Sequence, residues 1–177
     1  MDGRGKGSAW AGRVTVVVVA ALGLMPAVAT AADTASNVRL LNSVHKAAVA
    51  RLLGSAARQL DHPECQGLLD EFADASGRPL RVALEASGLP AAEYLEFAVF
   101  FYDAPSRLCG TSNLAITAPG SHAVFVCGER FVRQASRNSR HAEAALIHEA
   151  LHSLGLGENP PSSDYISERV LARCGQR

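Results

Sequence analysis

The chain has 177 residues, of which 48% are hydrophobic and 19% are charged, and its 17 basic residues equal its 17 acidic residues in number. This balance of charge gives no electrostatic reason to expect nucleic acid as a partner. The sequence contains no repeat, low-complexity tract or long charge run, and its length suits one domain of ordinary size.

Residues 1–31 have the features of a secretory signal peptide. A positively charged start is followed by the apolar run 14–24, and residues 29–31 (Ala-Thr-Ala) fit a cleavage site between small residues. The run is too short for a comfortable membrane span, although an uncleaved anchor is the alternative. Cleavage would leave a single domain, residues 32–177, with 14 basic and 16 acidic residues. We therefore expect a secreted or periplasmic protein without stable membrane association after cleavage.

The cysteines all lie in the predicted mature part, at Cys65, Cys109, Cys127 and Cys174. An even number in an exported chain predicts two disulfides, although spacing alone leaves three pairings open. We favour Cys65–Cys109, which would tie the helices to the loop before a hairpin, and Cys127–Cys174, which would tie that hairpin to the last helix. A cysteine metal site is the weaker alternative, because no C-x-x-C spacing occurs.

The first half of the mature chain reads as helices that form a packing layer behind a sheet. Residues 36–60 carry an apolar stripe with three- and four-residue steps, made by Val38, Leu41, Val44, Ala48 and Leu52. A second helix is expected over 65–75, where it would bury Leu68, Leu69 and Phe72. A third is expected over 79–86, with Val82 and Leu84 as candidate core residues, before the stop signal at 87–90.

Short apolar segments then predict three strands, over 97–102, 114–117 and 122–127. The turn residues 118–121 make a hairpin of the last two. A poorly patterned connection starts at Phe131, and a last helix is expected from about Asp164 to Cys174. The predicted fold is α+β: a helical layer, a short sheet with a hairpin, and one buried helix described next.

The sequence His148-Glu149-x-x-His152 lies in a helix predicted to run from an N-cap at Ser139 to Leu154. Positions i and i+4 share a helix face, so both imidazoles can bind one zinc ion. Glu149 beside them can act as general base toward a metal-bound water. The helix is apolar on most sides and therefore expected to be buried, where two histidines and a glutamate would need a partner such as zinc.

Two glutamates compete for the third ligand position. Glu158 follows His152 by six residues, with Gly155 between them to reverse the chain, and Glu168 lies on the last helix. We favour Glu158 because the glycine-turn spacing is the more specific signal. Asp164 is a poorer candidate, because capping of the last helix explains it equally well.

Three other histidines, His45, His122 and His141, are not expected to be metal ligands. His141 lies two turns before His148, about 10 Å away along the helix, and is read as a surface or rim residue. His45 lies near an apolar stripe without a partner at metal spacing, and His122 sits beside a predicted turn, where we expect it to be solvated.

The stretch His148-Glu149-x-x-His152-x-x-Gly155-x-x-Glu158 resembles the metzincin branch of zinc metallopeptidases. That family has histidine or aspartate in the last position and a methionine turn, whereas this chain has only Met1 and Met25. The resemblance therefore extends more safely to the wider zincin class. It implies a zincin-like domain in which a sheet edge, here one strand of the 114–127 hairpin, binds extended substrate beside the cleft.

The leading hypothesis is a secreted zinc metalloendopeptidase with a peptide or protein substrate, Zn²⁺ held by His148, His152 and Glu158, and Glu149 as the catalytic base. One alternative is a non-enzymatic exported domain with a structural metal site. The other is a zinc hydrolase that acts on a non-peptide bond. The sequence leaves the substrate, the oligomeric state and any activation by a propeptide open.

Overall fold

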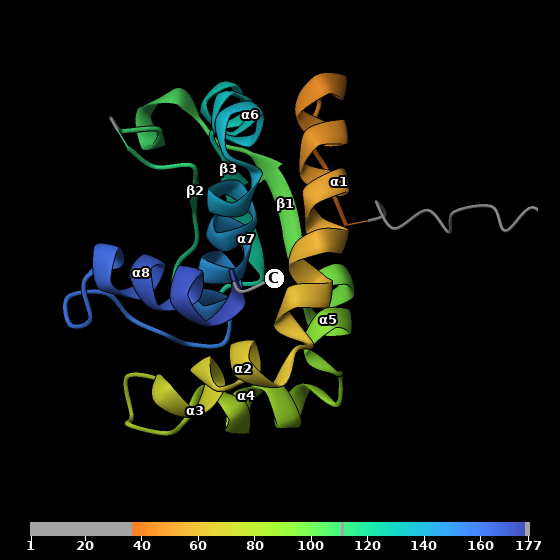
Figure 1. Ribbon diagram of the computed structural model, residues 1–177. Helices are drawn as coiled ribbons and strands as arrows, with labels where there is room; N and C mark the ends of the chain where they lie inside the picture. The colour runs from red at the N-terminus through yellow and green to blue at the C-terminus, as the bar shows by residue number, and fades with distance from the viewer. Residues whose placement is uncertain (1–36, 111, 176–177) are drawn as a thin grey trace, which may run out of the picture. The chain divides into compact units, whose positions relative to one another are not determined.

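The computed structural model describes residues 37–110 and 112–175, so the predicted signal peptide and its cleavage site lie outside the described residues. The described residues form a small α+β domain, which confirms the predicted fold class (Figure 1). Its α-helices are α1 (Ser43–Leu60), α2 (Pro63–Gln66), α3 (Leu68–Glu71), α4 (Leu80–Ser87), α5 (Ala91–Glu93), α6 (Gly128–Arg137), α7 (Ser139–Ser153) and α8 (Ser163–Cys174). A π-helical turn (Tyr94–Ala98) and a 3₁₀ turn (Ser106–Leu108) complete the helical elements of this region.

The sheet has the strand order β1-β3-β2, with β1 (Phe100–Asp103), β2 (Ala115–Ile116) and β3 (Ala123–Val126). Strands β2 and β3 form the predicted antiparallel hairpin, whereas β1 runs parallel to β3. On the far side of β1, Val38 makes a parallel bridge to Phe101. One edge of the sheet is therefore covered by the chain just before α1, and β2 lies at the opposite edge.

Helix α7 lies at the centre of the domain and contacts α1, α6, α8 and β2 (Figure 1). From Ala142 to Ser153 it has buried residues on every side, which confirms that this helix is buried. The largest apolar side chains in it, Leu146, Ile147 and Leu151, are fully buried. Each such side chain stabilises the fold by about 1.5 to 3 kcal/mol through burial of apolar surface, so this helix is fixed firmly in the core.

The predicted start of the first helix was wrong. Helix α1 begins only at Ser43, because the Asn42 side chain caps it by accepting from the N–H groups of Val44 and His45. Val38 is buried through its bridge to β1, not on a helix face, and Leu41 is 94% exposed. The apolar spacing of a helix continues into residues 37–39, but these residues are extended because they pair with β1.

Other helices also differ from the prediction. In place of one helix over 65–75 there are two short ones, α2, which starts earlier and ends at Gln66, and α3, although Leu68, Leu69 and Phe72 are buried as expected. Of the two core candidates in α4, Leu84 is buried and Val82 is exposed. Helix α6 was not predicted, because it buries only Phe131 and Ala135, too few residues to give a clear pattern. Helix α7 is capped by Asn138 and not by Ser139.

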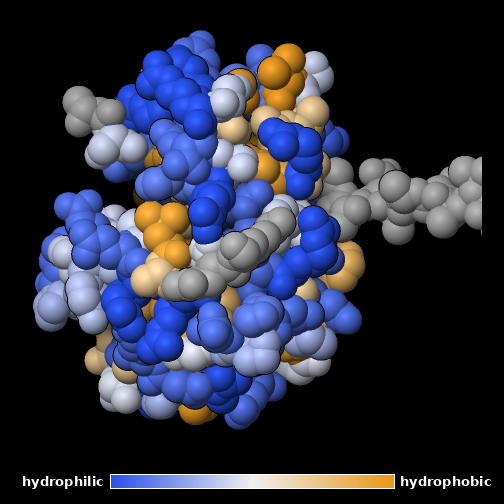
Figure 2. All heavy atoms as spheres, viewed as in Figure 1, coloured by the Kyte–Doolittle hydropathy of each residue, from blue (hydrophilic) through white to orange (hydrophobic). Residues whose placement is uncertain are grey.

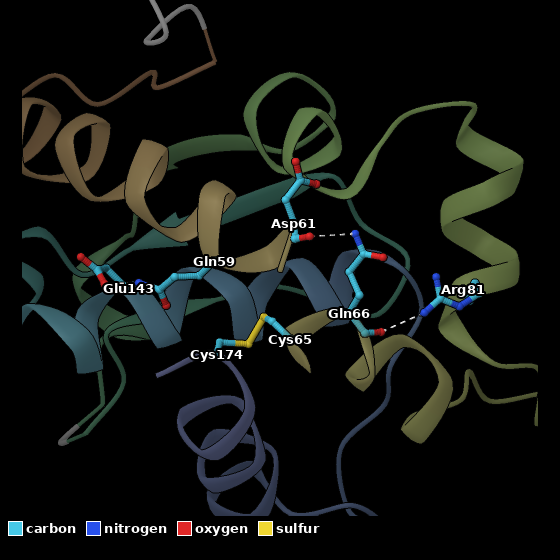
Figure 3. Close-up of a disulfide and its surroundings, with 7 residues drawn as sticks. All are labelled: Gln59, Asp61, Cys65, Gln66, Arg81, Glu143 and Cys174. Carbon is cyan, nitrogen blue, oxygen red and sulfur yellow. Dashed lines mark hydrogen bonds between the residues drawn. A yellow bond between two sulfur atoms is a disulfide. The ribbon is translucent and has the colours of Figure 1, made fainter. Parts of the chain in front are cut away.

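All four cysteines form disulfides, as expected, but the favoured pairing was wrong. The bonds are Cys65–Cys174 and Cys109–Cys127. Helix α8 packs against α2 and α3, which brings Cys174 to Cys65 (Figure 3). Cys127 ends the hairpin, and its N–H donates to the Leu114 carbonyl, close to the loop that carries Cys109. Both pairs result from tertiary packing, which cysteine spacing does not encode.

Removing the Cys65–Cys174 bond is expected to destabilise the domain more than removing Cys109–Cys127. The first closes a loop with a sequence separation of 109 residues and the second one of 18 residues, and in the chain-entropy model the longer loop gives the larger stabilisation, typically about 2 to 4 kcal/mol per disulfide. Denaturant unfolding of the double variants Cys65→Ala/Cys174→Ala and Cys109→Ala/Cys127→Ala measures both values. A larger loss in the second variant would contradict this expectation.

Two disulfides indicate an oxidising environment of the extracellular kind. None of the helices in residues 37–110 and 112–175 has an apolar stretch of the length needed to span a bilayer. The face of the molecule seen in Figure 2 is mainly hydrophilic, with hydrophobic residues in small separate groups.

Candidate metal centre

The two histidines of the motif lie on one face of α7 and point to the same place. His148 and His152 are 5% and 3% exposed, and their Nε2 atoms are 2.9 Å apart. One helical turn separates them, as the spacing of four residues predicts. Two imidazole nitrogens at this distance present their lone pairs to one small volume between them.

A tight turn after α7 brings a carboxylate to the same volume. Gly155 has a φ of 110°, a conformation that glycine adopts without steric cost. Its N–H donates to the His152 carbonyl, and the N–H of Leu156 donates to the Leu151 carbonyl. Glu158, three residues beyond the glycine, then places Oε1 3.6 Å from His148 Nε2 and 3.3 Å from His152 Nε2.

His148, His152 and Glu158 thus form a group that can hold a metal ion, with ligand atoms all within 4.8 Å of one another. It is the one such group among the residues that the structure describes. Ligands about 2.0 to 2.2 Å from a tetrahedral zinc ion lie about 3.3 Å from each other. The three observed separations, 2.9, 3.3 and 3.6 Å, are close to this value. The residues therefore fit a small divalent cation.

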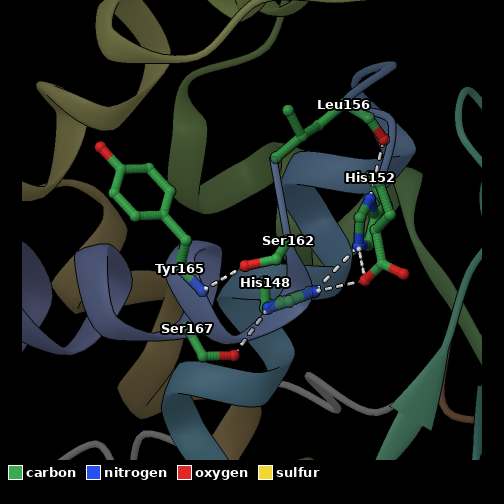
Figure 4. Close-up of polar contacts among 7 residues, drawn as sticks. His148, His152, Leu156, Ser162, Tyr165 and Ser167 are labelled. Atoms are coloured by element: carbon green, nitrogen blue, oxygen red, sulfur yellow. Dashed lines mark hydrogen bonds and ion pairs between the residues drawn. The ribbon is translucent and has the colours of Figure 1, made fainter. Parts of the chain in front are cut away.

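Hydrogen bonds on the outer side of each ring orient the imidazoles (Figure 4). His152 Nδ1 is 2.7 Å from the Leu156 carbonyl, which can only accept, so Nδ1 carries the proton and Nε2 keeps its lone pair. His148 Nδ1 is 3.1 Å from the hydroxyl of Ser167 on α8. Such contacts behind ligating histidines fix the tautomer and the ring orientation of the ligand.

The electrostatics favour the neutral form of His148 that a metal requires. Burial lowers its pKa, and the neighbouring His152 lowers it further, while the charge of Glu158 acts in the opposite direction. A buried imidazole beside another imidazole is therefore unprotonated at neutral pH and available as a ligand.

Glu149, next to His148 in the sequence, is 6% exposed and lies beside the three-residue group. Its Oε2 has no hydrogen-bond partner in the described part of the chain. Burial raises the pKa of this carboxyl to about 8, against the hydroxyl of Thr117, which lowers it. A buried carboxyl with an unpartnered oxygen is costly to keep, and such groups are concentrated at functional sites.

Two hollows, of about 270 and 230 Å³, adjoin the group, and both are lined by Ala115, His148 and Glu149. The larger extends between α7 and α8 toward His141, with Asp164 and Ser167 on the α8 side. The smaller is bounded by Thr117, Pro119 and Glu158. The three-residue group therefore borders the smaller hollow beside the edge strand β2, and His148 also borders the larger one.

Helix α8 forms one side of this cleft, and a disulfide and two ion pairs hold it in place. The Cys65–Cys174 bond holds its end, and Arg169 and Arg173 pair with Glu71 at the end of α3. The hydrogen bond from Arg169 lowers the pKa of Glu71, which keeps the carboxylate charged. These contacts fix the position of Ser167 behind His148.

The other candidate residues lie outside the group. Glu168 is exposed on α8, and Asp164 is exposed in the wall of the larger hollow. His141 is exposed at the rim of the same hollow, in agreement with its reading as a rim residue. His45 lies against Gly128 at the start of α6, and the exposed His122 shares a hydrogen bond with the Ala98 carbonyl.

Sequence reasoning missed the residues that support the site. Ser167, the carbonyl of Leu156 and Thr117 all reach the site through the tertiary fold. Ser167 is 19 residues from His148 in the chain, and no local pattern connects them. A search for hydroxyl groups near a motif in sequence would not have identified it.

The position of Glu158 leads to a prediction about the third ligand. Glu158→Ala is expected to weaken zinc binding by about 10- to 100-fold or more, because mutation of a residue that only hydrogen-bonds to a metal ligand already lowers metal affinity by that factor. Glu168→Ala is the matched control, since its carboxylate is exposed and outside the group, and should leave affinity unchanged. Competition titration with a chelating dye measures both. A large loss confined to the Glu168 variant would move the third ligand to α8.

Comparisons of the chain with protein-family models, with curated proteins and with solved structures find no match.

Proposed function

We propose that this protein is a secreted zinc-dependent endopeptidase. The observation that carries the proposal is the convergence of His148, His152 and Glu158 on one small volume, with the carboxylate of Glu149 beside it. Two imidazoles and a carboxylate are a donor set that zinc binds well. The two disulfides support export from the cytoplasm.

Each residue of the site has a defined task in this proposal. His148, His152 and Glu158 hold the ion, while Ser167 and the Leu156 carbonyl orient the two imidazoles. Zinc, when bound, supplies Lewis-acid chemistry that polarises the scissile carbonyl and makes water more acidic. Glu149 accepts a proton from the attacking water and then donates it to the nitrogen of the leaving amine.

The open surroundings of the group favour catalysis over a structural metal site. Structural zinc sites are closed by four protein ligands, whereas catalytic sites have three and keep one position open. Here three candidate ligands come together, and hollows of about 270 and 230 Å³ lie beside them. A structural site in an exported binding domain remains the alternative outcome for the experiment below.

A peptide substrate is favoured by the edge strand that borders the cleft. Leu114 accepts a hydrogen bond from the N–H of Cys127, and Ala115 stands opposite Val126. Because hydrogen-bonded and non-hydrogen-bonded pairs alternate in antiparallel strands, the backbone N–H and C=O of Ala115 point away from β3. Ala115 is buried but lines both hollows, so these groups border the cleft in which an extended peptide would pair with them. A non-peptide bond would not use them.

The test is hydrolysis of an unfolded, fluorescently labelled protein by purified mature protein of measured metal content. We expect cleavage that a zinc chelator abolishes and added zinc restores. Tightly bound zinc without cleavage would favour the structural-site alternative. Cleavage of small ester substrates but no peptide would favour the non-peptide hydrolase.

A further inference from the structure

The larger hollow has room for a side chain of a bound peptide. Its volume is about 270 Å³, whereas one water molecule in the liquid takes up about 30 Å³. His148 and Glu149 line this hollow. A side chain that enters it therefore belongs to a residue close to the site of the proposed reaction, so the chemistry of the wall bears on which peptides are bound.

The wall of this hollow carries acidic side chains but no basic ones among the described residues. Asp164 and Glu149 line it, together with the imidazoles of His141 and His148, whereas no described lysine or arginine does. The smaller hollow adds Glu158 and again no basic residue from the described part of the chain. This imbalance is local, because the whole sequence has 17 basic and 17 acidic residues.

Asp164 is the acidic residue of the wall whose charge the site itself does not offset. A divalent ion, when bound, brings two positive charges, which the carboxylates of Glu149 and Glu158 beside it balance. The Asp164 side chain, in contrast, has neither an ion pair nor a hydrogen bond with any residue that the structure describes. A cationic group in the larger hollow would therefore meet a carboxylate that is available to pair with it.

Capping of α8 does not account for Asp164. Ser162 caps this helix, because its hydroxyl oxygen accepts from the N–H of Tyr165 over 3.3 Å (Figure 4). The ion pairs that hold α8 against α3 use Arg169 and Arg173 and do not involve Asp164. A weak attraction between its charge and the first turn of the helix remains as a structural role, and Asp164→Glu retains that attraction.

The same hollow offers apolar surface to the stem of a long side chain. Ala144 and Ala145 line it from α7, and Leu171 lines it from α8. Lysine and arginine lay their aliphatic stems along apolar surface and keep the charged end near water. Asp164 is exposed, so the charged end would pair with it at the solvent side of the hollow.

We propose that the larger hollow binds a lysine or arginine side chain of the substrate and that Asp164 determines this specificity. The inference rests on the proposed endopeptidase function and narrows its substrates to polypeptides with a basic residue near the scissile bond. A glutamate or aspartate in the same place would face the Asp164 carboxylate without a counter-charge, so acidic residues there are rejected.

The first test uses peptides in which one lysine is moved through successive positions of an otherwise uncharged sequence. Matched peptides carry methionine or glutamate at the same position. With zinc-loaded wild-type protein we expect kcat/KM at one position to be about fivefold higher for lysine than for methionine, the scale of a partly exposed ion pair. The glutamate peptide should be the poorest substrate of the three. The lysine preference should fall at high salt, which screens exposed charges.

Substitutions of Asp164 show whether its charge is the cause. Asp164→Asn should abolish the preference for lysine, whereas Asp164→Glu should retain it. Asp164→Lys should reverse the order of the lysine and glutamate peptides. The matched control is Glu168→Gln, which removes a carboxylate from the same helix at an exposed position that lines neither hollow. It should show the wild-type preference.

Binding measured without turnover separates this inference from the proposed function. Fluorescence anisotropy gives the Kd of the same labelled peptides for zinc-loaded Glu149→Gln. We expect the preferred lysine peptide to bind about fivefold more tightly than its methionine counterpart, and the difference to vanish in Glu149→Gln/Asp164→Asn.

The outcomes are distinct for the two proposals. Cleavage without a lysine preference, or a preference that survives Asp164→Asn, would overturn the specificity proposal and leave the proposed function intact. Equal binding of all three peptides at every position would also overturn it. Lysine binding that depends on Asp164, in a protein that cleaves no peptide, would support the role of the hollow and count against the proposed function.

Discussion

Replacing His148 or His152 by alanine is expected to remove most of the zinc from a protein that otherwise carries about one ion per chain. The two Nε2 atoms are 2.9 Å apart and both are buried, so neither lost ligand has a substitute nearby. Mutation of a residue that hydrogen-bonds to a metal ligand lowers the affinity for the metal about 10- to 100-fold, and loss of the ligand itself should lower it further. Metal analysis after dialysis against a weak chelator gives the stoichiometry.

His62→Ala is the control for these two variants, because His62 is exposed and does not belong to the group that can hold a metal ion. It should retain a full equivalent of zinc. We expect α7 to remain folded in these variants, because burial of its apolar residues stabilises it without a metal ion. Circular dichroism checks this. A full equivalent of zinc in the double variant His148→Ala/His152→Ala would show that the metal binds elsewhere.

Glu149→Gln is expected to retain zinc and stability but to lose hydrolysis by about 10²- to 10⁴-fold, the usual contribution of a general base. The substitution keeps the size of the side chain but replaces the carboxylate that accepts the proton by a neutral amide. Glu149 is buried, and its Oε2 has no hydrogen-bond partner among the described residues. An amide group at that oxygen therefore breaks no hydrogen bond within the protein. Steady-state kinetics on a peptide substrate measure the loss.

Glu168→Gln makes the same chemical change at an exposed position of α8 and should keep full activity. The kinetic signature distinguishes a chemical role from a binding role, because loss of the base lowers kcat and leaves KM almost unchanged. Undiminished turnover in Glu149→Gln would exclude this residue as the base. Loss of zinc in the same variant would instead indicate that Glu149 supports the ligands.

Several features of the protein follow from the sequence by itself, because they depend on neighbours along the chain. A spacing of four residues places His148 and His152 on one helix face, whatever surrounds the helix. Apolar residues on most sides of α7 predict that it is buried, and Gly155 marks the reversal after it, with a φ of 110°. The hairpin of β2 and β3 was predicted from the turn residues between two short apolar runs.

The tertiary structure decided what depends on residues that are distant in the chain. Cys174 pairs with Cys65 across 109 residues, because α8 packs on α2 and α3. Residues 37–39 extend along β1 instead of beginning the first helix, because pairing with the sheet satisfies their backbone groups. Helix α6 forms although it has only two buried residues, since α1 and α7 supply its packing surface.

The same division applies within the candidate site. The motif located the histidines and Glu149, whereas the convergence of Glu158 on them depends on how the turn after Gly155 packs. Ser167 and Thr117 come from α8 and from the end of β2, and each reaches the site through contacts made by a different element. Local spacing fixes which side chains share a helix face, but only packing between elements decides which hydroxyl or carboxylate meets that face.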